Sequence, residues 1–197
     1  MDTDAQLMKH LIRLWADQQP ADEKKVPDEL DVLRSEAHRL LRSFLIARKK
    51  IKALGEEACD AVEADQQVWT AHVLLQDVIL RLCKFDDDDT RSWSFDQVAK
   101  KLRKRKETEK RVAGFDDLLK AFRKAIAHLT QQHRDSYIAH LAKTPPGKDK
   151  QPMPITVAVN QALQIIDKLS GKRVEFIEQD GKTDLRAEFE KILAGQG

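Results

Sequence analysis

Apolar residues recur at the three- and four-residue spacing of an amphipathic helix along most of this 197-residue chain. Residues that interrupt helices are scarce, because only seven glycines and six prolines occur and four of the prolines fall within residues 144–154. The strong helix formers Ala, Leu, Lys, Glu, Gln and Arg dominate the sequence. Since 41% of the residues are hydrophobic, a substantial core can form. We therefore predict an all-α protein.

The apolar spacing and the breaks between periodic segments define the expected helices. They span residues 4–17, 28–53, 57–84, 95–105, 115–142, 155–179 and 183–194. The second half of the 57–84 segment is apolar on most sides, which predicts the central helix of the core. Ser94 followed by Gln97 matches a capping box at the start of a helix. The helix from residue 155 reaches residue 179 if it tolerates Gly171, and a turn is expected at Asp180–Gly181.

Composition narrows the function classes. The net charge is only +2, so nothing in the overall balance demands nucleic acid. Cys59 and Cys83 provide neither a metal-ligand spacing nor a disulfide framework, and no histidines combine with carboxylates at a metal-binding spacing. The chain shows no signal peptide and no apolar run long enough to span a membrane. We expect a cytoplasmic protein without cofactor, metal or membrane association.

A short motif, Arg134-Asp-Ser-Tyr-Ile-Ala-His140, stands near the end of the 115–142 helix. Arginine is a permanent cation suited to phosphate, and histidine exchanges a proton near neutral pH. Six residues advance a helix by about 600°, which leaves the two side chains roughly 120° apart around its axis. One copy of Arg134 and His140 is therefore poorly arranged for joint catalysis, whereas a two-fold dimer that apposes two motifs would solve the problem. The alternative is a solvated arginine and a histidine at a helix end.

The motif resembles that of the HEPN superfamily of small helical domains. RDSYIAHLAK, which begins at Arg134, is similar to the R-[ND]-x-x-[IV]-A-H-L-D form of AbiU-type abortive-infection HEPN proteins. Residues 78–102, an apolar helix ending in Arg-Leu, an acidic loop and a new helix start, match a second block of that group. The resemblance covers roughly residues 30–145, and it departs from the pattern at Ser136 and Lys143.

This resemblance implies a HEPN-like antiparallel helical bundle with short additional C-terminal helices. The expected units are an N-terminal helix and linker (1–27), the HEPN-like bundle (28–145), a proline-rich loop (146–154), and C-terminal helices (155–197). The C-terminal helices are expected to pack on the bundle or extend it.

The resemblance also implies a metal-independent endoribonuclease that acts as a toxin or phage-defence effector. His140 would transfer the proton, Arg134 would stabilise the phosphorane, and Asp135 would support one of these groups. RNA would be the substrate, an antitoxin protein a partner, and the protein would be a homodimer through the motif helices. The alternative is a non-catalytic HEPN-like domain that binds a partner protein or a nucleotide.

Further residues are weaker candidates for RNA contact. Tyr137 could stack on a base, although packing between helices is its favoured role. His133 could assist proton transfer, although a surface position is favoured for it. Residues 100–111 hold eight Lys or Arg against two Glu. The candidates within this stretch are Lys101, Arg103, Lys104 and Arg105. They would either contact the RNA backbone or form a solvated helix end with pairs such as Arg105–Glu109. The solvated helix end is the favoured interpretation.

The three tryptophans, Trp15, Trp69 and Trp93, are expected in the core or at an interface.

Overall fold

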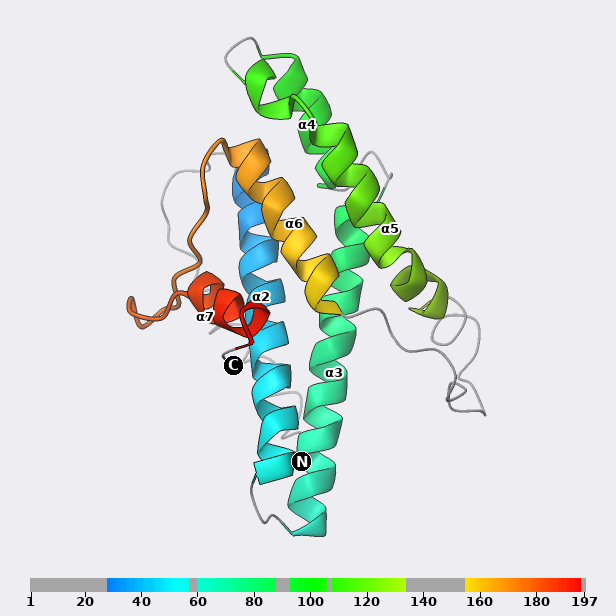
Figure 1. Cartoon of the computed structure of the whole chain (residues 1–197), viewed down its shortest axis with the longest axis vertical. Helices are drawn as coiled ribbons and strands as arrows, with labels where there is room; N and C mark the ends of the chain where they lie inside the picture. Colours follow the sequence, from blue (N-terminus) through cyan, green and yellow to red (C-terminus); the bar gives the residue numbers. More distant parts are fainter. Residues whose placement is uncertain (1–27, 57–59, 88–92, 106–107, 134–154, 196–197) are drawn as a thin grey trace, which may run out of the picture.

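The computed structural model describes residues 28–56, 60–87, 93–105, 108–133 and 155–195. Within these ranges the chain forms six α-helices and one short 3₁₀ helix, and an isolated bridge between Ile177 and Asp184 is its only β-pairing. The prediction of an all-α fold is confirmed. The helices, shown in Figure 1, are α2 (Glu29–Glu56), α3 (Ala61–Phe85), α4 (Phe95–Arg103), η1 (Glu109–Val112), α5 (Phe115–His133), α6 (Ile155–Ser170) and α7 (Leu185–Leu193).

The two longest helices, α2 and α3, form an antiparallel hairpin (Figure 1). The helices α4, α5 and α6 pack at the end where α2 begins and α3 ends, and α7 lies against α2. The far half of the hairpin extends beyond the other described helices. The molecule therefore has a packed end and a projecting two-helix end.

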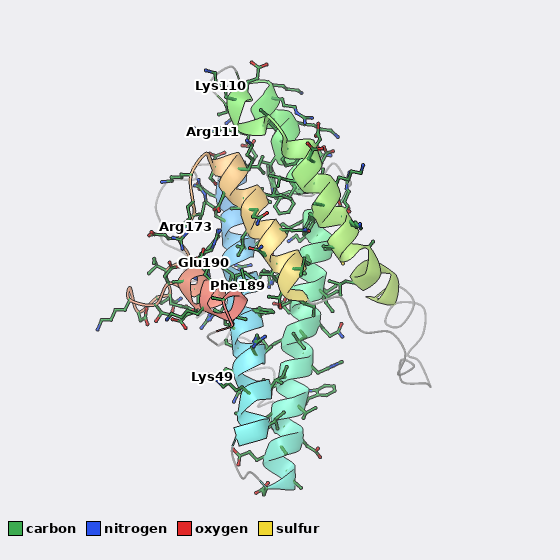
Figure 2. The ribbon with its side chains drawn as sticks, viewed as in Figure 1. Lys49, Lys110, Arg111, Arg173, Phe189 and Glu190 are labelled. Atoms are coloured by element: carbon green, nitrogen blue, oxygen red, sulfur yellow. The ribbon has the colours of Figure 1, made fainter. Side chains whose placement is uncertain are left out.

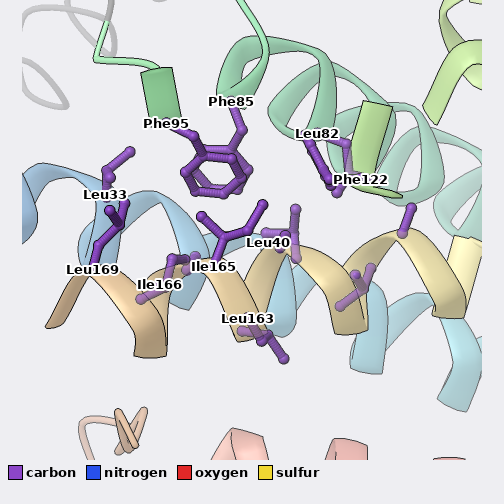
Figure 3. Close-up of a cluster of buried hydrophobic side chains, with 14 of the residues drawn as sticks. Leu33, Leu40, Leu82, Phe85, Phe95, Phe122, Leu163, Ile165, Ile166 and Leu169 are labelled. Carbon is purple, nitrogen blue, oxygen red and sulfur yellow. The ribbon is translucent and has the colours of Figure 1, made fainter. Parts of the chain in front are cut away.

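Three phenylalanines from three helices form the centre of the packed end. Phe85 stacks on Phe95 at a centroid distance of 4.6 Å, and Phe122 meets Phe95 edge-on at 5.2 Å. All three rings are fully buried, and aliphatic side chains of α2, α3 and α6 surround them (Figure 3). These are Leu33, Leu40, Leu82, Leu163, Ile165, Ile166 and Leu169.

The most enclosed helix is α6 rather than α3. Half of α6 is buried, eight residues of sixteen, because it lies against α2, α3, α4 and α5. In α3 the apolar residues Val73 and Leu80 remain 48% and 51% exposed. The prediction that the 57–84 segment forms the central helix is therefore wrong, since α2 covers only one of its two apolar faces. Trp69 was expected in the core or at an interface, and its side chain is 67% exposed, which excludes the core and leaves the interface as the prediction.

Helix ends follow local signals closely. The Ser94 hydroxyl accepts a hydrogen bond from the Gln97 amide at 3.4 Å, which confirms Ser94 as the N-cap of α4. The expected continuation of the 155–179 helix past Gly171 is wrong. Gly171 adopts φ +71°, which ends α6 at Ser170, and a Cβ there would stand 3.0 Å from Arg111 Nε. The predicted turn at Asp180–Gly181 is present, with Gly181 at φ +67°.

Charged side chains join α2 to α3 across the hairpin. Asp77 Oδ2 accepts hydrogen bonds from Ser43 Oγ at 2.7 Å and from Arg81 Nε at 2.9 Å. Arg81 Nη1 also donates to Glu36 Oε2 at 2.6 Å, and Lys84 Nζ lies 3.7 Å from Glu36 Oε1. Burial of the Asp77 carboxyl alone would raise its pKa, but the hydrogen bonds from Arg81 and Ser43 outweigh burial and lower the pKa.

Truncation of the central ring should strongly destabilise the fold. Phe95→Ala removes the ring that contacts both Phe85 and Phe122, and it leaves a cavity that the surrounding helices cannot fill. We expect a loss of about 3–5 kcal/mol in the free energy of unfolding, measured by chemical denaturation. Leu193→Ala, at a position 44% exposed near the end of α7, should cost less than about 1 kcal/mol. Equal losses in the two variants would contradict the assignment of the core.

The hairpin network should make stability depend on pH in the acid range. The pKa of Asp77 is lower in the folded chain than its value of about 3.9 in an unfolded chain. The contribution of Asp77 to the free energy of unfolding is therefore fully present above about pH 4. It is lost as the pH falls through the folded pKa. Asp77→Asn should therefore destabilise the protein by about 1 kcal/mol at pH 7, and the difference from wild type should shrink below pH 4. Chemical denaturation of both proteins between pH 7 and pH 3 measures the difference in their free energies of unfolding. A difference that stays constant over this range would contradict the prediction. Ser43→Ala should show the same trend with a smaller amplitude.

Candidate functional site

The motif predicted from the sequence begins one residue after α5. Arg134, Asp135, Tyr137 and His140 lie outside the described residues, and His133 is the last residue of α5, with its side chain also outside them. The structure describes the helix that leads into the motif. Its placement fixes where the motif begins.

One face of α5 is buried against α6 and α3. Phe122 and Ile126 are 0% and 1% exposed, and Leu119, Ala125 and Leu129 extend the same face. Asp116 and Asp117 lie in the first turn, where acidic residues favour the helix dipole. Arg123 Nε also donates to Asp86 Oδ1 at 2.6 Å, which ties α5 to the C-cap of α3. The acidic segment that follows α3 thus contacts α5 through Asp86.

The basic residues considered for RNA contact are engaged mainly with carboxylates of the same chain. Lys101 Nζ lies 3.2 Å from Glu29 Oε1, and Arg105 Nη2 lies 3.5 Å from Glu29 Oε2. Arg103 Nη2 donates to Asp116 Oδ1 at 2.6 Å. Arg105 therefore pairs with the start of α2 rather than with the expected Glu109. Lys104 is exposed and forms no ion pair within the described part of the chain.

Lys101 makes a second contact that the sequence pattern did not indicate. Its ammonium lies 4.2 Å from the centroid of the half-buried Trp93 ring, a cation–π geometry. Trp93 thus covers one side of Lys101 while Glu29 engages the ammonium. These contacts hold Lys101 in a fixed position at the end of α4.

The basic residues and the motif lie at opposite ends of α5. Arg103 contacts Asp116 in the first turn of α5, whereas His133 is its last residue. Seventeen residues of helix separate Asp116 from His133, which is about 26 Å. Figure 1 shows α4 and η1 gathered at the start of α5. Within one subunit, the structure therefore does not bring the basic stretch to the point where the motif begins.

The basic stretch ends with two cations in the short helix η1. Lys110 and Arg111 lie in η1, and the Arg111 side chain approaches Gly171 at the end of α6 (Figure 2). A cation at a helix C-terminus is favourable because unpaired carbonyl groups accumulate there. The local signal that could have indicated this contact is the glycine that follows the apolar pattern of α6.

The most buried charged side chain belongs to Arg186, which joins α7 to α6. Its Nη1 and Nη2 atoms donate to Asp167 Oδ1 at 3.1 Å and Oδ2 at 2.8 Å, and Nε donates to Glu190 Oε1 at 3.1 Å. Glu190 also accepts a hydrogen bond from Arg173 at 2.9 Å, which lowers the pKa of the Glu190 carboxyl (Figure 2). The arginine is fully engaged within the fold, so this cluster stabilises the α6–α7 contact.

A groove of about 820 Å³ runs between α2 and α7. Its lining combines apolar side chains with basic ones, among them Lys49 (Figure 2). The apolar lining comes from Leu45, Ile46, Ile51, Leu185 and Ile192. Among the described residues of the lining, Glu188 is the one carboxylate, so these residues do not supply the paired acid and base of a hydrolytic site.

Other chemistries find little support among the described side chains. Burial raises the pKa of the Cys83 thiol, which disfavours the nucleophilic thiolate. No group of three or more His, Cys, Asp or Glu within the described residues is arranged to hold a metal ion. In the same part of the chain, no helix has the length and apolar character needed to cross a membrane.

Comparison with protein-family models, curated proteins and solved structures gives no match for this chain.

Proposed function

We propose that this protein is a HEPN-type, metal-independent endoribonuclease that acts in the cytoplasm as a toxin or phage-defence effector. The observation that carries the proposal is the motif Arg134–His140, which follows directly on the last residue of α5 in an all-α bundle. Helix α5, which ends one residue before the motif, is packed against α6 and α3.

The proposed reaction uses the ribose 2′-hydroxyl as an internal nucleophile. Its oxygen attacks the adjacent phosphorus, the bond from phosphorus to the 5′-oxygen breaks, and a 2′,3′-cyclic phosphate and a 5′-hydroxyl result. His140 accepts the proton of the 2′-hydroxyl or returns one to the 5′-oxygen. Arg134 donates hydrogen bonds to the phosphorane oxygens, and Asp135 orients one of these groups. Because the nucleophile belongs to the substrate, a metal-bound water is not required.

A second copy completes the proposed site. The roughly 120° between Arg134 and His140 on one helix means that groups from two motif helices would be combined at a two-fold axis. The homodimer through the motif helices is therefore part of this proposal, as is an antitoxin protein that would restrain it.

The second candidate is a non-catalytic helical domain that binds a partner protein or a nucleotide. The ion pairs of Lys101, Arg103 and Arg105 favour it, because these cations are already engaged and lie far from the start of the motif. A cleavage assay separates the two candidates directly.

Cleavage should depend on both motif residues and not on metal. We expect the full-length protein to cut single-stranded RNA in the presence of chelator and to leave 2′,3′-cyclic phosphate ends, detected by mass spectrometry. His140→Ala and Arg134→Ala should each reduce the rate by about 10²–10⁴-fold. His38 lies on α2, and its ring forms a hydrogen bond with the Ile177 carbonyl, so His38→Ala should retain the rate. Wild-type protein that leaves diverse RNAs uncut, with and without chelator, would refute the proposal.

The ion pairs at Glu29 should limit RNA affinity. Glu29→Gln removes the carboxylate that engages Lys101 and Arg105, so RNA binding should become tighter. The plot of log affinity against log salt should steepen by about 0.7 for each cation that gains a phosphate contact on a single strand. Fluorescence anisotropy at several salt concentrations measures both. Asp31→Asn removes the same charge from the same turn, where Asp31 pairs with Arg34, and should have a smaller effect. Equal effects would show that only the net charge matters.

A further inference from the structure

Helix α3 carries a second apolar face that no other described helix covers. Val62, Trp69, Val73 and Leu80 are 78%, 67%, 48% and 51% exposed. Successive members are seven, four and seven residues apart, and Gln66 and Gln76 fill the remaining positions of an alternating four–three repeat. We call these six residues the α3 seam. This spacing is that of a coiled-coil contact.

The seam lies opposite the face that packs on α2. At 100° per residue, its apolar members fall within about 40° of one another, and the buried residues of α3 centre roughly 160° away. Those buried residues are Gln67, Ala71, Val78, Leu82 and Phe85. The hairpin projects beyond the packed end of the molecule (Figure 1), so much of the seam has an open approach among the described elements. Large apolar side chains aligned on an exposed face mark a contact surface.

The order of residues in the seam is symmetric about Ala71. Consider two copies of α3 that run antiparallel, with a two-fold axis that crosses the seam at the level of Ala71. Val62 then faces Leu80, and Trp69 faces Val73. Gln66 then faces Gln76. Apolar side chains meet apolar side chains and amides meet amides, which is the self-complementarity that a two-fold contact requires.

Charge favours the same orientation. The start of α3 is acidic, with Asp60, Glu63 and Asp65, whereas the basic residue of its last turn is Lys84. The Lys84 side chain is 53% exposed. An antiparallel pair places the acidic start of one helix beside the basic end of the other, and the two helix dipoles then point in opposite directions. A parallel pair places the two acidic starts side by side and aligns the dipoles.

We propose that two copies of this chain associate through the α3 seam, antiparallel about Ala71. The projecting hairpins then form a four-helix arrangement in which the two α3 helices lie at the centre and each α2 lies outside. This goes beyond the proposed ribonuclease function, because it uses a surface that the motif does not contribute to. RNA cleavage and association through α3 can each fail while the other holds.

The mass of the full-length protein tests the association. Trp69→Glu places two charges near the axis, and sedimentation should show that the mass is half that of wild type, with the dissociation constant raised by at least about 30-fold. Val73→Glu should have the same effect. Ile46→Glu, at a 38%-exposed position on α2 in the groove against α7, should leave the mass unchanged. Because Trp69 is largely exposed, circular dichroism should show an intact fold. A monomeric wild type, or an unchanged mass in both seam variants, would overturn the proposal.

Disulfide trapping tests the orientation. A Val62→Cys, Leu80→Cys variant in a Cys59→Ser, Cys83→Ala background should form 62–80 disulfides between chains on oxidation. Eighteen residues of helix separate the two positions by about 27 Å, so one chain cannot form this bond by itself. Peptide mapping by mass spectrometry should find 62–80 links in excess over 62–62 and 80–80 links. A predominance of the like pairs would show a parallel contact and overturn the antiparallel arrangement.

Discussion

The contact of Phe85, Phe95 and Phe122 is the interaction on which the rest of the packed end depends. It joins the last residue of α3, the first residue of α4 and the middle of α5, which are three successive α-helices of the chain. With these points fixed, α6 fills the space against α2 and buries half of its residues. The direction of α5 is fixed by the same contact. The position at which the Arg134–His140 motif begins is therefore set mainly by buried aromatic rings, and the Arg123–Asp86 pair adds a charged contact between α5 and the end of α3.

Local information in the sequence was sufficient for the helices and for some of their ends. The apolar spacing predicted 28–53 and 57–84 where the structure has Glu29–Glu56 and Ala61–Phe85, because the period of a buried face is visible in any window of ten residues. Ser94 was recognised as an N-cap because its hydroxyl bonds an amide only three residues away. Gly171 was misjudged, since a glycine within a helical pattern is compatible with either continuation or a stop. What decides between them is the positive φ, together with the close approach of Arg111 from a distant segment.

Long-range pairing could not be predicted in the same way. The sequence shows that Lys101 and Arg105 are basic, but not that Glu29, more than seventy residues away, lies between them. Arg186 is similar, because its bidentate pair with Asp167 depends on how α7 packs against α6. For the motif, helix geometry predicts that one copy of Arg134 and His140 is poorly arranged, but it does not say which residues of a distant segment would complete the site. The features of the candidate site that the sequence could predict are those that depend on residues close together in the chain.

The misassigned role of α3 connects the fold to the question of assembly. Apolar residues on two opposite sides of a helix predict that both sides are covered, and the simplest reading places such a helix in the centre of a domain. In this chain α2 covers one side, and the other described helices leave the α3 seam open. A second copy would supply the missing side, so the sequence pattern would describe the assembly rather than the subunit. The motif also calls for a second copy, but at a different surface. One two-fold axis gives a dimer, whereas two distinct self-complementary surfaces give a tetramer if the axes intersect at right angles. Under the proposed ribonuclease function, the number of subunits in the active particle would therefore show whether one axis serves both surfaces.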